Sequence, residues 1–191
     1  LDADEVDYAE GVFRARATNR TASIAELAAK FPGQLDGRAR YAPETPRPTY
    51  PNGCHVAEVE VETETGLVAV THYSLVDDFG TIVNPMLLQG QVHGGVAQGL
   101  GQALLENIVY GEGAQLLTGS FMDYGVPRAD DMPWVNFDTL GTISPTNPLG
   151  AKGCGEAGTI GSMPSIINAI IDALDGTNVE MPATPETVWR A

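Results

Sequence analysis

Two clusters of glycine constrain the fold of this chain more than any other feature of its sequence. The first cluster places five of the 22 glycines within residues 90–101. It lies inside an apolar-rich segment, Met86 to Leu105, in which Asn84 can serve as the N-cap and Pro85 as the first helical residue. Each glycine inside a helix costs up to about 1 kcal/mol relative to alanine. We therefore expect another part of the molecule, or a ligand, to approach this helix closely.

The second cluster places five more glycines within residues 150–161, which predicts a glycine-rich turn. Its Gly153-x-Gly155-x-x-Gly158 pattern matches the dinucleotide-binding fingerprint, which must follow a strand and open a helix. Residues 147–150 before it are typical of a turn, and Glu156 would repel a pyrophosphate. A nucleotide-binding domain is therefore the weaker alternative.

Glu156 is the only acidic residue in this turn. Glycines let the backbone approach a ligand closely, and the N-terminus of the helix that follows favours anions. A carboxylate held there is a candidate general base, because burial raises its pKa toward the working range. The alternative is that Glu156 caps the helix or accepts hydrogen bonds from loop amides.

Four glutamines accompany the first glycine cluster, at positions 89, 91, 98 and 102. An amide side chain both donates and accepts hydrogen bonds, which suits recognition of an uncharged polar ligand. Alternatively, Gly94 and Gly95 only permit close packing. His93 is most simply a packed histidine, and the three histidines of the chain lack the spacing of a metal site.

The remaining patterns predict an α+β fold with mixed, mainly antiparallel hairpins, two main helices and long irregular segments. Ser23 and Glu26 form a capping-box pattern, and the proline-rich residues 33–51 form a connector. Residues 1–50 are expected to be a less regular leading segment of a single 1–191 unit. The predicted elements are helices at 23–31, 86–105 and 162–176, hairpin strands at 55–62 with 67–76 and at 106–110 with 115–117, a strand at 135–140 and a helical turn at 184–189.

Composition excludes several classes of function. The formal net charge is −15, and a chain so acidic is a poor partner for nucleic acid, whose binding depends on Lys and Arg. Cys54 and Cys154 suggest neither a disulfide framework nor a zinc site. There is no apolar run of the ~20 residues that a membrane span needs and no signal peptide, so we expect a cytoplasmic location. The missing initiator Met fits a processed chain, a truncation or a piece of a longer polypeptide.

Four motifs, in order along the chain, resemble the molybdopterin-binding large subunit of molybdenum hydroxylases, the family of xanthine dehydrogenase, aldehyde oxidase and aerobic carbon monoxide dehydrogenase. Residues 150–158 are similar to the loop that bears the catalytic glutamate. Residues 91–101 are similar to the glycine-rich start of a cofactor-contacting helix. Residues 122–129 and 184–189 are similar to two further landmarks. The resemblance covers essentially the whole chain and corresponds to the C-terminal part of the cofactor-binding domain.

The resemblance implies an oxidoreductase that uses water to hydroxylate an aldehyde, an N-heterocycle or carbon monoxide. It implies that Glu156 is the base that deprotonates the attacking hydroxide and that Gln98 contacts an oxo ligand of molybdenum. The pterin dithiolene, and no protein side chain, would hold the metal. The cofactor-binding residues that the resemblance implies are Gln98, Gly99, Lys152, Gly153, Cys154 and Gly155.

The resemblance also implies partners. The cofactor would be molybdopterin, in its plain or its cytosine dinucleotide form, and the other half of the large subunit would complete its pocket. Iron-sulfur clusters and FAD are expected on other domains or subunits, since two cysteines cannot bind such clusters. The alternative is a non-catalytic fragment or interaction module that binds no cofactor by itself and dimerises through exposed apolar surface. The substrate itself is not specified by these residues.

Overall fold

The computed structural model describes residues 2–42 and 47–191, and the chain divides into two compact units, Leu1–Ala42 and Pro43–Ala191. Residues 43–46 of the predicted connector lie outside the described residues. No helix among the described residues is long and apolar enough to cross a membrane.

The first unit contains a small sheet where we expected a less regular segment. After a 3-10 turn at Ala3–Glu5, strands β1 (Val6–Ala9), β2 (Val12–Ala15) and β3 (Thr21–Ser23) pair antiparallel in that order. These strands are only three or four residues long, too short to show a clear alternation of apolar and polar residues. The helix that follows, α1 (Ile24–Lys30), was predicted, and its Ser23–Glu26 capping box is present.

The second unit is built on a three-stranded sheet. Strands β4 (Asn52–Glu62) and β5 (Leu67–Asp78) form the predicted antiparallel hairpin. Strand β6 (Val135–Thr139) pairs parallel to β5 on its other side. The fold is therefore α+β and mainly antiparallel, as the sequence predicted.

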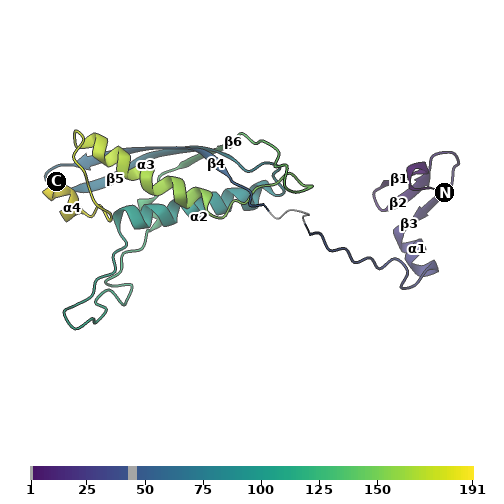
Figure 1. Ribbon diagram of the computed structural model, residues 1–191, viewed down its shortest axis with the longest axis horizontal. Helices are drawn as coiled ribbons and strands as arrows, with labels where there is room; N and C mark the ends of the chain where they lie inside the picture. Colours follow the sequence, from purple (N-terminus) through teal and green to yellow (C-terminus); the bar gives the residue numbers. More distant parts are fainter. Residues whose placement is uncertain (1, 43–46) are drawn as a thin grey trace. The chain divides into compact units, whose positions relative to one another are not determined.

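Two long helices lie side by side along this sheet (Figure 1). Helix α2 (Pro85–Leu104) begins as predicted, with the Asn84 side chain accepting a hydrogen bond from the Leu87 N–H. Helix α3 (Ala157–Ala173) begins five residues before residue 162, where we predicted its start. Ser162 is instead fully buried inside α3, where its hydroxyl donates to the Thr159 carbonyl. The short helix α4 (Pro185–Arg190) is capped by Thr184 as expected.

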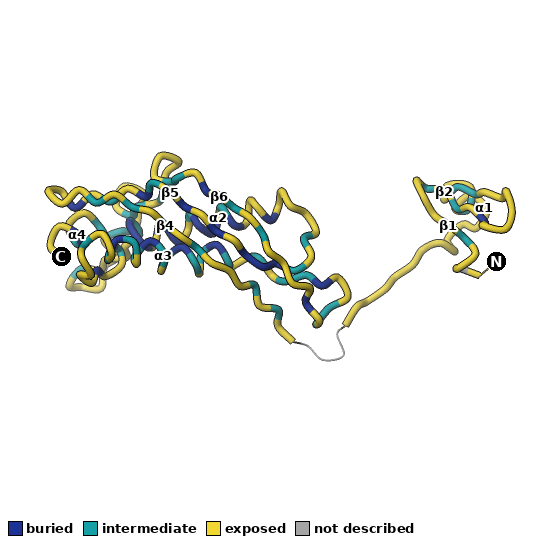
Figure 2. The backbone as a smooth tube through the Cα atoms, turned by 90° about the horizontal axis from the view of Figure 1, so that it is seen from above, coloured by how far each residue is buried: buried dark blue, intermediate teal, exposed yellow. Residues whose placement is uncertain are grey.

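The core of this unit lies between the sheet and the two helices, where the buried positions of β5, α2 and α3 face one another (Figure 2). Its fully buried apolar side chains come from one residue of β5, four of α2 and two of α3. They are Tyr73, Val92, Val96, Leu100, Ala103, Ile166 and Ile170. In the helix predicted at 162–176, Ile166 and Ile170 are fully buried, and Ile167 and Leu174 pack against the core.

Close contact between α2 and α3 explains part of the first glycine cluster. A Cβ on Gly95 would lie 2.9 Å from the Thr159 nitrogen, and one on Gly99 would overlap the Ser162 hydroxyl. From the other helix, a Cβ on Gly158 would overlap the Val92 carbonyl. Because no side chain fits at these three positions, the two backbones can approach closely.

A long loop leaves the end of α2 and extends away from the helices before the chain returns to β6 (Figure 1). The hairpin predicted at 106–117 is reduced to one bridge between Tyr110 and Leu116. A 3-10 turn, η2 (Ala129–Asp131), precedes β6. Large apolar side chains on and beside this loop are exposed, including Phe121 at 89% and Met122 at 93%.

Candidate functional site

The loop that bears Glu156 is fastened to the end of β5 by backbone hydrogen bonds. Gly80 and Ala151 form an antiparallel bridge, and the Lys152 N–H donates to the Phe79 carbonyl over 2.9 Å. The Asn147 side chain adds a clamp, because its amide donates to the Ala151 carbonyl and its oxygen accepts from the Ala151 N–H. Residues 147–152 are therefore a fixed segment of the second unit.

Asp78, the last residue of β5, is the polar centre of this attachment. Its buried carboxylate accepts hydrogen bonds from the Lys152 ammonium at 2.6 Å, the Gly80 N–H at 2.9 Å and the Thr142 N–H at 3.0 Å, and also from the Thr142 hydroxyl. The Lys152 hydrogen bond, followed by that of the Thr142 hydroxyl, holds the pKa of Asp78 well below its ordinary range, although burial opposes this.

Glu156 stands at the junction between this loop and α3, as the N-cap residue of the helix. Its side chain makes no capping hydrogen bond and is exposed, so the capping alternative is not what the structure shows. The described residues do not bury it either, although burial was our reason to expect a base at this position. The side chain is thus accessible at a surface that the described residues leave open.

Gln98, the amide that the resemblance assigned to the cofactor, lies close to this junction. It projects from α2, is exposed, and its side-chain oxygen lies 3.5 Å from the hydroxyl of Thr159, in the first turn of α3. The same hydroxyl donates to the Gly95 carbonyl at 3.1 Å. The α2–α3 contact therefore places a neutral amide and the start of the Glu156 helix next to each other.

Several glycines near this junction have no packing partner. Gly90 and Gly94 of α2, and Gly153 and Gly155 of the loop, have no heavy atom within 4 Å of the position that a Cβ would occupy. Open backbone beside an amide and a carboxylate is what close contact with a flat polar cofactor requires. Gly99, which we also assigned to the cofactor, is buried against Ser162 instead.

The remaining predicted residues, Lys152 and Cys154, line a cavity of about 310 Å³ between the loop and the start of α2. The Lys152 ammonium is bonded to Asp78 and Thr142. Cys154 is a free, half-buried thiol packed against the core. Among the described residues, no group of three or more His, Cys, Asp or Glu side chains could hold a metal ion.

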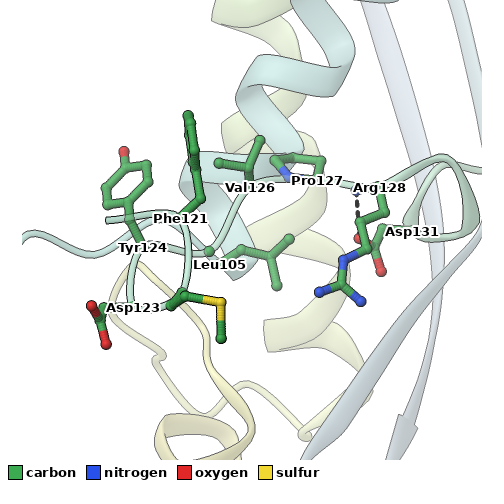
Figure 3. Close-up of a pocket in the computed structure, with 10 residues that line it drawn as sticks. Leu105, Phe121, Asp123, Tyr124, Val126, Pro127, Arg128 and Asp131 are labelled. Carbon is green, nitrogen blue, oxygen red and sulfur yellow. Dashed lines mark hydrogen bonds between the residues drawn. The ribbon is translucent and has the colours of Figure 1, made fainter. Parts of the chain in front are cut away.

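A second hollow of about 610 Å³ lies in the long loop, around the 122–129 motif (Figure 3). It is lined by Phe121, Val126 and Arg128 among others, and by none of the predicted site residues. Tyr124 donates a hydrogen bond to Glu106 at 2.9 Å, and this carboxylate raises the pKa of Tyr124. No glycine with an open Cβ position and no predicted site residue lines this hollow among the described residues.

Sequence reasoning missed Asp78, Thr142 and Asn147, which hold the loop. The available signal was the pair Asp77-Asp78 at the end of an apolar strand, directly before Phe79-Gly80. Charged residues at such a position need partners when buried. His93 also differs from the satisfied histidine that we expected, because its Nε2 is buried and has no hydrogen-bond partner among the described residues.

Comparison with known proteins identifies the family. A model described as a molybdopterin cofactor-binding domain matches residues 1–133. The gamma subunit of the 6-hydroxypseudooxynicotine dehydrogenase complex of Paenarthrobacter nicotinovorans is 36% identical over 199 residues, which cover 98% of this chain and 25% of that protein. The carbon monoxide dehydrogenase large chain of Afipia carboxidovorans is 35% identical over 150 residues, which cover 77% of this chain and 18% of that protein.

The fold of the chain also matches a solved structure. The crystal structure of quinoline 2-oxidoreductase from Pseudomonas putida 86 superimposes with a TM-score of 0.83 at 34% identity, covering 99% of this chain and 26% of that one. The fold is that of a molybdopterin cofactor-binding domain. The chain belongs to the molybdopterin cofactor-binding domain family, and its resemblance to the molybdenum hydroxylase large subunit is confirmed. It spans about a quarter or less of the length of these relatives.

Proposed function

We propose that this chain is the part of a molybdenum hydroxylase large subunit that carries the general base, Glu156, and one wall of the molybdopterin site. The observation that carries the proposal is the position of Glu156, exposed and without a capping bond at the start of α3, on an anchored loop. The named relatives, a dehydrogenase complex subunit and a carbon monoxide dehydrogenase large chain, support the reaction class.

The residues of the chain fit the cofactor. The open Cα positions of Gly94, Gly153 and Gly155 give a flat ligand access to the backbone, and the Gln98 amide can hydrogen-bond to it without adding charge. When bound, the cofactor supplies the metal centre that accepts two electrons from the substrate. Glu156 accepts the proton of the water whose oxygen enters the product, because it is the carboxylate that the loop holds at this surface.

The proposed substrates are an aldehyde, an N-heterocycle or carbon monoxide. We further propose molybdopterin in its plain or cytosine dinucleotide form, a pocket completed by the rest of the subunit, and electron transfer to iron-sulfur and FAD groups on partner domains or subunits. A homodimer and a cytoplasmic location belong to the same proposal. Relatives that extend far beyond this chain support the need for a completing part.

The decisive experiment replaces Glu156 by Gln in the full-length subunit. The amide keeps the size of the side chain but cannot take up the proton, so turnover should fall by at least about 100-fold, within the range attributed to general bases. Molybdenum content, measured by mass spectrometry, should stay unchanged. Glu64→Gln, in the exposed turn between β4 and β5, is the matched control. Normal turnover of Glu156→Gln would reject Glu156 as the base.

A second function is favoured by the exposed apolar side chains of the long loop, Phe121, Met122 and the nearby Trp134. Exposed apolar surface of this kind marks an interaction site. The isolated chain would then be an interaction module that binds no cofactor by itself. Light scattering and metal analysis of the purified chain discriminate between the two, because a molybdenum-loaded single chain would reject the module.

A further inference from the structure

The ion pair between Asp78 and Lys152 is the strongest polar feature that the proposed chemistry does not use. Its two atoms lie 2.6 Å apart, and the side chains are 8% and 11% exposed. Neither charge could remain buried alone without a large cost, so each keeps the other in place. Thr142 bridges the pair, because its hydroxyl donates a hydrogen bond to the Asp78 carboxylate and accepts one from the Lys152 ammonium at 3.0 Å.

The segment that follows Lys152 contains no buried ion pair comparable to Asp78–Lys152 among the described residues. Gly153 donates one backbone hydrogen bond, to the Thr49 hydroxyl at 3.1 Å. The Cβ positions of Gly153 and Gly155 are open, and the Glu156 side chain makes no capping bond. Within the segment, Cys154 packs against the core and the Glu156 carbonyl accepts a hydrogen bond from the Ile160 N–H at 2.9 Å, and Gly158 lies against Val92 of α2. Glu156 therefore lies in a short span between the Lys152 contacts and the helix contact of Gly158.

The location of Glu156 thus depends on both ends of the span. The far end is fixed by helix packing, and the near end by the Asp78–Lys152 pair together with the backbone bonds of residues 150–152. The oxygen of a general base must lie within about 3 Å of the atom whose proton it takes. A displacement of about 1 Å can cost about 100-fold in rate. Small movements of Lys152 are therefore enough to affect the chemistry.

We propose that Asp78 and Lys152 are positioning residues for Glu156, which their buried ion pair holds at the cofactor surface. This inference rests on the proposed function of Glu156. It also gives Lys152 a role other than the cofactor contact that the family resemblance implied, because its ammonium is directed to Asp78 and Thr142. Thr142 supports the pair as a shared hydrogen-bond partner.

The two cysteines of the chain provide a test that does not depend on activity. Cys154 lies within the span and is half-buried, whereas Cys54 lies on β4 and is exposed. Both can be alkylated with iodoacetamide in the 191-residue chain and quantified by mass spectrometry. In Asp78→Asn and Lys152→Met, we expect the Cys154 rate to rise at least about fivefold and the Cys54 rate to stay unchanged. Lys152→Arg, which retains the charge, should remain near the wild-type rate.

Three outcomes would overturn the proposal. One is an unchanged Cys154 rate in both variants. Another is a parallel rise at Cys54, which would show general loosening of the unit. The third is the same rise in Asp138→Asn, the matched control at an exposed aspartate of β6. If Asp78→Asn does not fold, Lys152→Met compared with Lys152→Arg decides the matter.

Kinetics of the full-length subunit complete the test, with an aldehyde, an N-heterocycle and carbon monoxide offered in turn. For the substrate that the wild-type enzyme turns over, Lys152→Met should lower kcat by about 10- to 100-fold with KM and molybdenum content unchanged, and Lys152→Arg should restore most of kcat. A change in KM alone would overturn the positioning role. If Glu156→Gln retains activity, the proposed function of Glu156 fails. The alkylation result still shows whether the Asp78–Lys152 pair holds the loop in place.

Discussion

The glycines of α2 and of the Glu156 loop fall into two sets with opposite surroundings. At Gly95, Gly99 and Gly158, an added Cβ would meet the neighbouring helix. At Gly94 and Gly155, it would meet nothing within 4 Å. The first set explains why two helices pack closely, and the second has no explanation within this chain. The difference separates the part of the glycine-rich sequence that builds the fold from the part that we propose contacts the cofactor.

The largest expected effect comes from filling a packed position. Gly158→Val would push a branched side chain into the Val92 carbonyl, where backbone and not a flexible side chain stands in the way. Overpacking of this kind costs about 3 kcal/mol, so the urea midpoint of the second unit should drop markedly. Gly155→Val, three residues earlier, is the control and should leave the midpoint close to wild type. Equal midpoints for the two variants would remove the distinction between the sets.

Acid should weaken the Asp78–Lys152 ion pair, which holds the start of the Glu156 loop, whereas the packing at Gly95, Gly99 and Gly158 involves no titrating group. The pKa of Asp78 is lowered in the folded chain, chiefly by Lys152, so its contribution to the free energy of unfolding is complete above the unfolded carboxyl value of 3.8. That contribution is lost as the pH falls below this value toward the lower folded pKa. Hydrogen bonds to charged groups are worth about 2 kcal/mol each.

The measurement is the free energy of unfolding between pH 6 and pH 2.5 for the wild type and for Asp78→Asn. The wild type should lose more stability than the variant over the acidic part of this range. Parallel pH profiles would mean that the carboxylate of Asp78 does not stabilise the fold through its charge.

How much of this arrangement the sequence could predict depends on the kind of interaction. The β4–β5 hairpin and the start of α2 were predicted because alternation and an Asn-Pro cap are local signals. The start of α3 was predicted five residues too late, because serine is a favourable N-cap residue and Ser162 precedes an apolar helical stripe. Its actual role, buried against Gly99, depends on a helix that lies about 60 residues away in sequence.

The site shows the same limit. Glu156 could be proposed from the sequence because it is a lone acid among glycines, and Gln98 because the family resemblance implied it within a run of amides. It did not identify Asp78, whose partner Lys152 is 74 residues away. It also did not separate Gly99 from Gly155, since identical residues gain different roles only when the helices pack. Long-range pairing is the information that a single sequence does not provide.

Gly95 and its neighbour Gly94 on α2 allow a more sensitive test of the difference between packed and open glycines. A Cβ on Gly95 would lie 2.9 to 3.1 Å from backbone atoms of α3, so the helices must separate by a few tenths of an ångström to accept it. We expect Gly95→Ala to destabilise the unit by about 1 to 2 kcal/mol, measured by urea unfolding, because the gain in helix propensity offsets part of the overpacking. A stabilised Gly95→Ala variant would show that the contact between α2 and α3 is looser than the structure indicates.

The smallest expected effect is also opposite in sign. Gly94→Ala adds a methyl group in open space, so it should stabilise the isolated chain, by up to about 1 kcal/mol of helix propensity. In the full-length subunit, the same methyl group would occupy the surface that we assign to the cofactor, so molybdenum content should fall. Gly90→Ala, one turn earlier and also open, tells how far along α2 this surface extends. Because a packing role and a ligand role predict opposite changes at this position, unchanged molybdenum content in a stabilised Gly94→Ala variant would remove Gly94 from the cofactor surface.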